Sequence, residues 1–316
     1  MMGNNVGRFA PSPSGKLHLG NLFCSLLAWL SARQQGGKIL LRIEDLDRER
    51  SRAEYVRQAE EDLRFLGLFW DEGGTAGGEA YFQSSRDGYY EELLRKLEKQ
   101  GLLYPCFCTR AELHAASAPH ASDGDPIYSG KCRNLSPEDV NRLKESRSPA
   151  LRLKVPSETV SFTDGHYGEI SQNLERDCGD FILRRSDGVF AYQLAVVADD
   201  TAMGVTQVVR GRDLLSSTPR QIYLYRLLGF PVPKFFHTPL LLDPDGRRLS
   251  KRDRDVSLDA LREKGFSGED VVGRLAFLTG LLDTPRPVTP EELIPLFDWE
   301  RVPKEDILLP KNLFCG

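Results

Sequence analysis

The sequence lacks the features that mark several classes of protein. None of its apolar runs approaches the roughly 18 to 20 residues of a membrane helix, and the N-terminus has no basic segment followed by an apolar one. The net charge of −4 is opposite in sign to that of a protein that coats nucleic acid without regard to sequence. We therefore expect a cytoplasmic protein without membrane contact, although a local RNA-binding face is compatible with this charge.

Cysteine is scarce as well, and its distribution argues against disulfides. The 316 residues include six cysteines, too few for a disulfide framework in a chain of this length. Three of them are scattered, at Cys24, Cys178 and Cys315. The other three gather in one segment, which points to a different use.

That segment predicts a structural zinc site. Cys106 and Cys108 form a C-x-C pair, and Cys132 follows after a loop rich in Gly, Pro and Ser. Three thiolates from two short loops suit zinc, which prefers soft ligands in tetrahedral geometry. The alternative is three reduced thiols beside a loop. The candidates for a fourth ligand are His114, His120 and Tyr128, of which histidine is the ordinary zinc ligand.

Residues 7–21 combine a strand start, a rigid loop and the start of a helix. Pro11 and Pro13 fix their own φ angles near −65° and favour extended conformations in the residues before them. The apolar run at 22–30 predicts a buried helix that stops at the glycine pair 36–37. The start of such a helix can bind phosphate through free N–H groups and the helix dipole, or it can be an ordinary structural corner. The side chains that would add donors there are His18 and Asn21.

The order of elements predicts an α/β protein with a Rossmann-like parallel-sheet catalytic domain. Residues 38–43 form a β-type run after the first helix, which gives a parallel βαβ unit. Residues 189–197 indicate a buried, strand-like segment, and strands are expected at 206–209 and 235–242 around a helix at 216–228. The predicted divisions are the first half of this domain at 1–101, a zinc-binding α+β insertion at 102–188, the second half at 189–254, and a small helical C-terminal module at 255–316.

A second candidate for phosphate binding follows a tight turn late in the chain. Residues 246–254 hold five cations in nine positions. Such a run is usually a solvated surface, but this one is expected on a loop at the end of the sheet. A cationic loop there could stabilise charge that develops on a leaving phosphate group.

Three segments together resemble the signatures of class I aminoacyl-tRNA synthetases of the glutamyl and glutaminyl type. They are the string RFAPSPSGKLHLGN at 8–21, the string RIEDLD at 42–47 and the string RLSKR at 248–252. The resemblance implies activation of L-glutamate by ATP, with Mg²⁺. One departure is Asn21, which stands where the family tetrapeptide usually has a second histidine. An amide donates a hydrogen bond there without carrying charge.

The resemblance also implies roles for individual residues. Glutamate has two carboxylates and an ammonium, and guanidinium groups bind carboxylates bidentately. The implied glutamate-binding residues are Arg8, Phe9, Ala10, Pro11, Ser12, Glu44, Tyr192 and Arg210, with Glu44 on the ammonium and either arginine on either carboxylate. The implied ATP-binding residues are His18, Gly20, Asn21, Arg248, Ser250 and Lys251, of which His18, Asn21 and Lys251 are the catalytic ones. Each could instead be structural: Glu44 as an acidic helix start, the arginines as ion-pair partners, Tyr192 as a core residue. Val196 replaces an asparagine frequent in tRNA-charging relatives, which predicts weaker glutamate binding.

Within the family, the chain resembles most the short enzymes that transfer glutamate to queuosine in tRNA(Asp). Their zinc-binding insertion has tyrosine as fourth ligand, so the resemblance favours Tyr128 over the histidines. The last signature lies about 65 residues before the C-terminus, which we take as the short form without an anticodon-binding domain. The expected partners are L-glutamate, ATP and the anticodon stem-loop of tRNA(Asp) bearing queuosine, and the expected state is a monomer. The alternatives are a short enzyme that charges a tRNA 3′ end, a non-catalytic RNA-binding paralogue, and a nucleotidyltransferase acting on a small molecule.

Overall fold

A parallel sheet begins at the N-terminus of the computed structural model, which describes residues 5–109, 112, 127–249 and 257–314. Strand β1 (Val6–Phe9) leads through helix α1 (Leu19–Arg33) to β2 (Lys38–Leu41), and β1 and β2 pair in parallel with Val6 opposite Lys38. The short strand β3 (Glu72–Gly73) continues the sheet beyond β2. Helix α2 (Ala53–Phe65) lies between β2 and β3 in the sequence. The predicted βαβ unit is confirmed.

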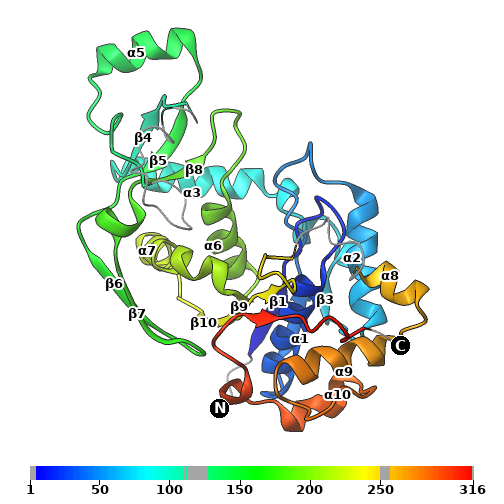
Figure 1. Cartoon of the computed structure of the whole chain (residues 1–316). Helices are drawn as coiled ribbons and strands as arrows, with labels where there is room; N and C mark the ends of the chain where they lie inside the picture. The colour runs from blue at the N-terminus through cyan, green and yellow to red at the C-terminus, as the bar shows by residue number, and fades with distance from the viewer. Residues whose placement is uncertain (1–4, 110–111, 113–126, 250–256, 315–316) are drawn as a thin grey trace.

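A second parallel unit continues this sheet on the other side of β1. Strands β9 (Gln207–Gly211) and β10 (Lys234–Thr238) are parallel and joined by helix α7 (Thr218–Leu228). The N–H of Thr206 donates to the carbonyl of Val6 at 3.0 Å, which places β9 beside β1 (Figure 1). The spatial order is therefore β3, β2, β1, β9, β10. The chain reverses direction across the sheet between β1 and β9, and the carboxyl ends of strands at such a point form a ligand crevice in α/β folds.

Two details of the second half differ from the predictions. The prediction of a strand-like segment at 189–197 is wrong, because Tyr192–Ala202 forms helix α6. Residues 194–200 of this helix are all buried, so the apolar run has no period that separates a buried helix from a buried strand. The strand expected at 235–242 is divided: β10 ends at Thr238, and β11 (Leu241–Leu242) pairs instead with β12 (Ile307–Leu308).

An antiparallel region separates the two halves of the parallel sheet. After helix α3 (Asp87–Lys99), strands β4 (Leu103–Cys106), β5 (Ala150–Leu153) and β8 (Phe181–Arg184) form an antiparallel sheet in the order β4, β5, β8. Helix α5 (Pro137–Ser146) projects at the far end of this region in Figure 1. The hairpin of β6 (Thr159–Asp164) and β7 (Gly168–Asn173) reaches back toward β10. The N–H of Gly165 donates to the carbonyl of Phe235 at 2.8 Å, so the hairpin tip touches the parallel sheet.

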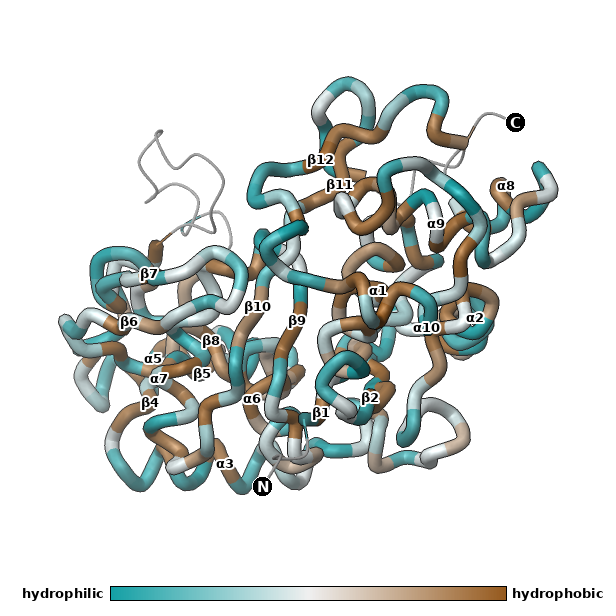
Figure 2. Tube along the Cα trace, turned by 90° about the horizontal axis from the view of Figure 1, so that it is seen from below, coloured by the Kyte–Doolittle hydropathy of each residue, from teal (hydrophilic) through white to brown (hydrophobic). Residues whose placement is uncertain are grey.

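The C-terminal segment is helical, as predicted, and packs against α1 and α2. It contains α8 (Leu258–Glu263), α9 (Gly268–Leu278) and α10 (Pro290–Leu293), and α10 starts with a capping box at Thr289. Apolar residues concentrate along β1, β9, β10 and the helices around them (Figure 2). Among the described residues, no helix is long and apolar enough to cross a membrane. The remaining single turns are η1 (Thr75–Gly77), η2 (Glu79–Tyr81), η3 (Gln83–Ser85), η4 (Leu174–Cys178), η5 (Arg212–Ser217), η7 (Ile294–Leu296) and η8 (Trp299–Arg301).

Candidate active site

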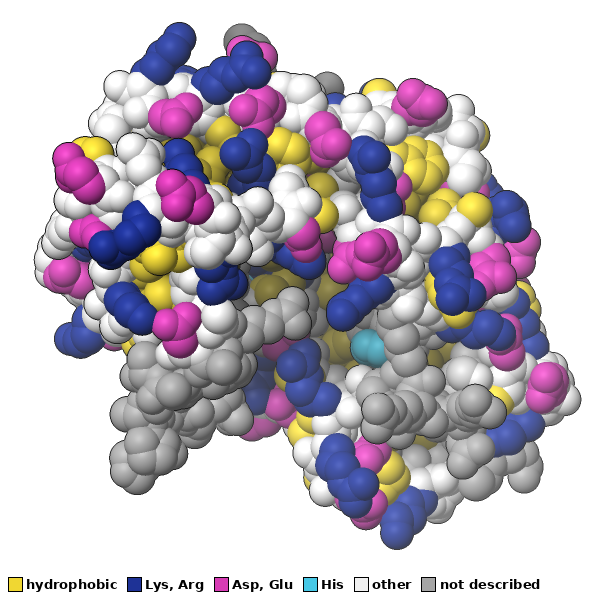
Figure 3. All heavy atoms as spheres, turned by 90° about the horizontal axis from the view of Figure 1, so that it is seen from above, with side chains coloured by type: hydrophobic (Ala, Val, Ile, Leu, Met, Phe, Trp, Pro, Cys, Tyr) yellow, Lys and Arg dark blue, Asp and Glu magenta, His cyan; other side chains and the backbone are white. Residues whose placement is uncertain are grey.

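A cavity of about 530 Å³ lies where β1 and β9 end. It is at the sheet position where strand order reverses, as the α/β architecture leads one to expect. Figure 3 shows the face of the molecule seen from above, which is hollowed near its middle, with Lys and Arg side chains at the edges of the hollow. The predicted site residues that line the cavity are Arg8, Phe9, Ala10, Pro11, Ser12, His18, Gly20, Asn21, Glu44, Tyr192, Arg210 and Arg248. Residues far apart in the sequence therefore share one space.

The start of α1 is capped by the two side chains that were predicted to donate to phosphate. The Nδ1 atom of His18 accepts the backbone N–H of Asn21 at 3.2 Å, and the side-chain oxygen of Asn21 accepts the backbone N–H of His18 at 3.1 Å. Because Nδ1 is an acceptor, the neutral imidazole of His18 carries its proton on Nε2. A Cβ at Gly20 would lie 3.0 Å from Nδ1 of His18, so glycine leaves room for the ring. The Nε2–H of His18 and the amide group of Asn21 are the donors at this helix start.

Backbone hydrogen bonds tie the proline-rich loop to the end of β2. The N–H of Arg42 donates to the carbonyl of Phe9 at 2.9 Å, and the N–H of Glu44 donates to the carbonyl of Pro11 at 3.0 Å. These two bonds continue the pairing of β1 and β2 past the strands. They hold Glu44 next to the loop that carries Ser12, and both side chains line the cavity.

Glu44 is not a free carboxylate, because it shares a buried ion-pair network. Arg42 is fully buried, and its Nη2 lies 3.1 Å from Oε1 of Glu44 while its Nη1 lies 2.6 Å from Oδ1 of Asp200. Burial raises the pKa of Glu44, and the attraction of Arg42 opposes that rise. Neither Arg42 nor Asp200 was among the site residues predicted from the sequence. Arg42 and Glu44 are two residues apart, and in an extended segment such residues point to the same side. This spacing was an available signal for Arg42.

Arg8, at the end region of β1, is buried and paired only loosely. It is 5% exposed, its Nη1 donates to the carbonyl of Val209 at 2.8 Å, and its Nε lies 3.6 Å from Oδ1 of Asp200. Its Nε–H has no hydrogen-bond partner among the described residues. A buried guanidinium with an unused donor costs free energy unless a ligand accepts from it. Arg8 is therefore suited to bind an anion in the cavity.

Arg210, at the end of β9, is also 5% exposed, and all its partners are neutral. Its Nε donates to Nε2 of His237 at 3.1 Å, its Nη1 to Oε1 of Gln221 at 2.8 Å and its Nη2 to Oγ1 of Thr218 at 2.9 Å. The hydroxyl of Tyr192 is 3.5 Å from Nη1. Within the described part of the chain, no carboxylate forms an ion pair with Arg210. The pocket thus contains a buried cation whose charge an anionic ligand would balance.

The second signature lies only partly within the described residues. Arg248 lines the cavity and pairs with Asp213 at 2.6 Å, and Leu249 is buried beside it. Ser250 and Lys251 lie outside the described residues. Val196, the position expected to weaken glutamate binding, is 1% exposed in α6 and packs in the core rather than on the cavity wall.

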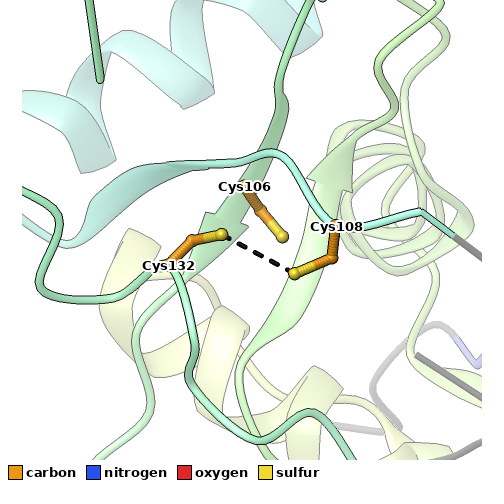
Figure 4. Close-up of side chains that lie close together, drawn as sticks. All are labelled: Cys106, Cys108 and Cys132. Carbon is orange, nitrogen blue, oxygen red and sulfur yellow. Dashed lines mark hydrogen bonds between the residues drawn. The ribbon is translucent and has the colours of Figure 1, made fainter. Parts of the chain in front are cut away.

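The cysteine cluster lies far from this cavity, at the end of β4. The sulfur atoms of Cys106, Cys108 and Cys132 all lie within 4.8 Å of one another, and their side chains point toward one common centre (Figure 4). Sγ of Cys108 is 3.6 Å from Sγ of Cys132. The hydroxyl of Tyr128 is 3.6 Å from Sγ of Cys106 and 3.8 Å from Sγ of Cys108. His114 and His120 lie outside the described residues.

These distances fit a tetrahedral zinc ion. With Zn–S bonds of about 2.3 Å and a Zn–O bond of about 2.0 Å, ligand atoms lie about 3.5 to 3.8 Å apart. Cys106, Tyr128 and Cys132 are buried, and the N–H of Phe107 donates to Sγ of Cys132 at 3.5 Å. The guanidinium carbon of Arg152 lies 3.8 Å from the centre of the Tyr128 ring, where a cation would stabilise negative charge on the phenol oxygen. The donor set suits a closed structural site.

Comparison with known proteins defines the class. The model of the catalytic domain of class I tRNA synthetases (E and Q) matches residues 5–306. A relative from Symbiobacterium thermophilum, called glutamyl-Q tRNA(Asp) synthetase, is 55% identical over 98% of this chain and 97% of its own length. The chain belongs to the class I synthetase family of the glutamyl and glutaminyl type, and it is a ligase with the mixed α/β catalytic fold of that class.

Other relatives place the chain within this family. A glutamyl-Q tRNA(Asp) synthetase from Nitratidesulfovibrio vulgaris is 50% identical over 97% of this chain and 96% of the relative. A glutamate–tRNA ligase from Sulfurihydrogenibium is 42% identical over 96% of this chain, which covers 65% of that relative. The crystal structure of a glutamate tRNA ligase from Elizabethkingia meningosepticum in complex with its amino acid superposes with a TM-score of 0.83 at 31% identity, covering 98% of this chain and 68% of the other.

Proposed function

We propose that this enzyme activates L-glutamate with ATP and transfers the glutamyl group to queuosine in the anticodon of tRNA(Asp). The observation that carries the first half is the cavity with two buried guanidinium groups, Arg8 and Arg210, of which Arg210 has only neutral partners among the described residues. Two such groups match the two carboxylates of glutamate. The names of the relatives that this chain covers almost completely support the second half.

Different residues on the cavity wall bind the two carboxylates and the ammonium group of glutamate. Arg8 and Arg210 bind the carboxylates, and Tyr192 adds a hydroxyl 3.5 Å from the guanidinium of Arg210. Glu44 binds the ammonium, because it is the carboxylate on the cavity wall beside the proline-rich loop. Ser12 and the backbone of residues 9–11 complete the floor at the end of β1.

Adenylate formation takes place at the start of α1. An oxygen of the glutamate α-carboxylate bonds to the α-phosphorus of ATP, the bond between that phosphorus and the bridging oxygen breaks, and pyrophosphate leaves with the electron pair. The Nε2–H of His18, the amide of Asn21 and the N–H groups near Gly20 donate to the phosphates. Arg248, Ser250 and Lys251 stabilise the charge that moves onto pyrophosphate, and Mg²⁺ supplies further neutralisation when bound. A hydroxyl of queuosine then attacks the glutamyl carbonyl and releases AMP.

We also propose that the insertion at 102–188 is stabilised by one zinc ion. Cys106, Cys108, Cys132 and Tyr128 would hold it, and a closed site of four protein ligands stabilises the fold without a catalytic position. The insertion would contact the tRNA and the modules at 1–101 and 189–254 would form the catalytic domain, with residues 255–316 as a helical module. The proposed state is a monomer.

Transfer of labelled glutamate tests the function. We expect pyrophosphate exchange that depends on glutamate, and labelling of tRNA(Asp) that contains queuosine but not of tRNA(Asp) without it. Because a glutamate–tRNA ligase is 42% identical to this chain, the competing function is charging of a tRNA 3′ end. Labelling of tRNA(Glu) in place of tRNA(Asp) would establish that function. A protein without any glutamate-dependent exchange would be a non-catalytic paralogue, and exchange with a different acid would indicate a nucleotidyltransferase.

A further inference from the structure

The guanidinium of Arg210 is held by a buried chain of groups that starts in the insertion. Asp164 ends β6, and its Oδ2 lies 2.6 Å from Nδ1 of His237 in β10. Both side chains are fully buried. The other ring nitrogen of His237, Nε2, lies 3.1 Å from Nε of Arg210 in β9. Strands β6, β10 and β9 thus contribute one residue each to a chain of hydrogen bonds that ends at Arg210 in the cavity wall.

Hydrogen-bond chemistry determines where the proton of His237 lies. The Nε–H of an arginine can only donate, so Nε2 of His237 must be the acceptor. The proton of the neutral imidazole is therefore on Nδ1, from which it is donated to Oδ2 of Asp164. Burial lowers the pKa of His237 to about 4, and the nearby Arg210 adds to this, so the ring stays neutral. The hydroxyl of Thr218, 3.3 Å from Nε2, can also donate to it.

The carboxylate of Asp164 is itself fixed by the backbone. Its Oδ1 accepts the N–H of His166 at 3.0 Å, the N–H of Tyr167 at 2.9 Å and the N–H of His237 at 3.3 Å. Oδ2 is thereby directed toward the imidazole. Because one oxygen serves the turn and the other serves the ring, the position of the hairpin tip and the orientation of the ring depend on the same side chain.

The remaining donors of Arg210 face the cavity. Of its five N–H groups, one each from Nε, Nη1 and Nη2 is used by His237, Gln221 and Thr218. The other two make only contacts of 3.5 Å and 3.4 Å, with the hydroxyl of Tyr192 and the carbonyl of Leu214. Tyr192 and Leu214 both line the cavity. A carboxylate that enters there meets the two N–H groups that the protein leaves weakly used.

We propose that Asp164 and His237 are positioning residues for glutamate binding: Asp164 selects the imidazole tautomer whose Nε2 accepts from Arg210, and this contact turns the free edge of the guanidinium toward the substrate carboxylate. The proposal rests on the proposed function for the assignment of Arg210 to glutamate. It ties the turn after β6, which belongs to the insertion, to the affinity for the amino acid. Neither residue touches substrate.

Two substitutions of His237 separate a positioning role from a structural one. In His237→Gln, the longer amide reaches the place of Nε2 and can accept from Arg210, but the contact with Asp164 is lost. In His237→Asn, the shorter amide reaches the place of Nδ1 and donates to Asp164, but Nε–H of Arg210 has no acceptor. Losing a hydrogen bond to a charged group costs about tenfold or more. We expect KM for glutamate to rise about tenfold in His237→Asn and clearly less in His237→Gln.

Asp164→Asn tests the choice of tautomer. The oxygen of the new amide would remain with the backbone N–H groups of the turn, so its NH₂ group would face Nδ1 of His237. The ring would then move its proton to Nε2, where it meets the Nε–H of Arg210. We expect KM for glutamate to rise about tenfold or more, with KM for ATP unchanged. The control is His166→Asn, which removes another buried imidazole of the same turn, one that contacts Pro303 instead.

The measurements are steady-state pyrophosphate exchange with glutamate or ATP varied, and ¹⁵N chemical shifts of His237 in the full-length protein. Three results support the proposal. Nδ1 of His237 is protonated in the wild type, Nε2 is protonated in Asp164→Asn, and KM for glutamate is higher in His237→Asn than in His237→Gln. A protonated Nε2 of His237 in the wild type would overturn the proposal even if the variants failed to fold. If the wild type is active and His237→Asn has the same KM for glutamate, the proposal is overturned as well. A wild type without glutamate-dependent exchange would instead refute the proposed function, while the tautomer measurement would still be readable.

Discussion

The cavity between β1 and β9 and the cysteine cluster at the end of β4 are both built to bind, but they are built in opposite ways. The cavity is open and is lined by cations, among them Arg210, whose partners in the described part of the chain are neutral. The cluster is closed, and its three sulfur atoms lie within 4.8 Å of one another. The walls of the cavity are held by the protein's own hydrogen bonds, whereas the cluster has ligand atoms that a metal ion would join.

This difference predicts which property each region controls. The walls of the cavity are held by the protein's own hydrogen bonds without the substrate. A substitution on the cavity wall should therefore change affinity or rate more than stability. In the cluster, two loops would depend on the proposed shared zinc ion, so a substitution there should change stability and metal content before it changes the chemistry. Four substitutions test this division, in order of decreasing expected effect.

Lys251→Ala is expected to have the largest effect. It removes the cation that we propose stabilises pyrophosphate as it leaves, and loss of one such group costs about 10³-fold in rate. Adenylate formation, followed by pyrophosphate exchange, should nearly vanish while the unfolding midpoint stays that of the wild type. Lys144→Ala, an exposed lysine in α5, is the control and should retain full exchange. Normal turnover by Lys251→Ala would show that ATP is bound elsewhere.

Cys106→Ser tests the cysteine cluster and should affect stability and metal content. The weaker ligand releases zinc and lowers the free energy of unfolding by on the order of 3 kcal/mol. Below the unfolding transition, glutamate-dependent exchange should continue. Metal analysis and thermal unfolding are the measurements. The control is Cys178→Ser, which changes a buried cysteine outside the cluster and should keep its zinc. If Cys106→Ser bound no less metal and unfolded at the same temperature as the wild type, the cluster would be three ordinary thiols.

Glu44→Gln should raise KM for glutamate about tenfold, because a neutral amide replaces the partner of the substrate ammonium. The amide oxygen still accepts from Arg42, so stability should change little. Glutarate, which has both carboxylates and no ammonium, serves as the probe of mechanism. Its inhibition constant should be the same in wild type and variant, and an equal loss of glutarate binding would assign Glu44 to the structure instead.

Tyr128→Phe should have the smallest effect, a weakening of zinc binding by up to about tenfold in competition with a chelator. The sulfur ligands remain, so zinc content at saturation should be preserved. His114→Ala and His120→Ala are the matched variants. Unchanged affinity in Tyr128→Phe together with a loss in either histidine variant would move the fourth ligand to that histidine.

The sequence predicted the parts of the molecule that depend on local chemistry. The prolines and glycines around α1, the parallel βαβ unit and the close approach of the three cysteines all follow from short-range patterns. The resemblance of three signatures brought Arg8, Glu44 and Arg210 into one proposed site, and the structure places them on one cavity. Arg8 and Glu44 are recognisable because they lie within two of the signatures, whereas the assignment of Arg210 rests on the resemblance of the chain as a whole.

The parts that the sequence did not predict depend on burial and on distant contacts. Helix α6 was expected as a strand-like segment because a run that is apolar on every side has no period. His237 and Asp164 were not singled out, since they are 73 residues apart and meet only through the turn after β6. The same holds for Arg42 and Asp200, which are separated by 158 residues. Apart from the two-residue spacing of Arg42 and Glu44, these buried networks join residues that have no fixed spacing in the sequence.

A crystal structure with a non-hydrolysable analogue of glutamyl-adenylate would test the central claim most directly. Our account predicts that the adenylate phosphate lies at the start of α1 beside His18, and that the glutamyl side-chain carboxylate accepts from Arg8 or Arg210 on the cavity wall. An analogue bound outside this cavity, or a glutamyl carboxylate that contacts neither arginine, would contradict it.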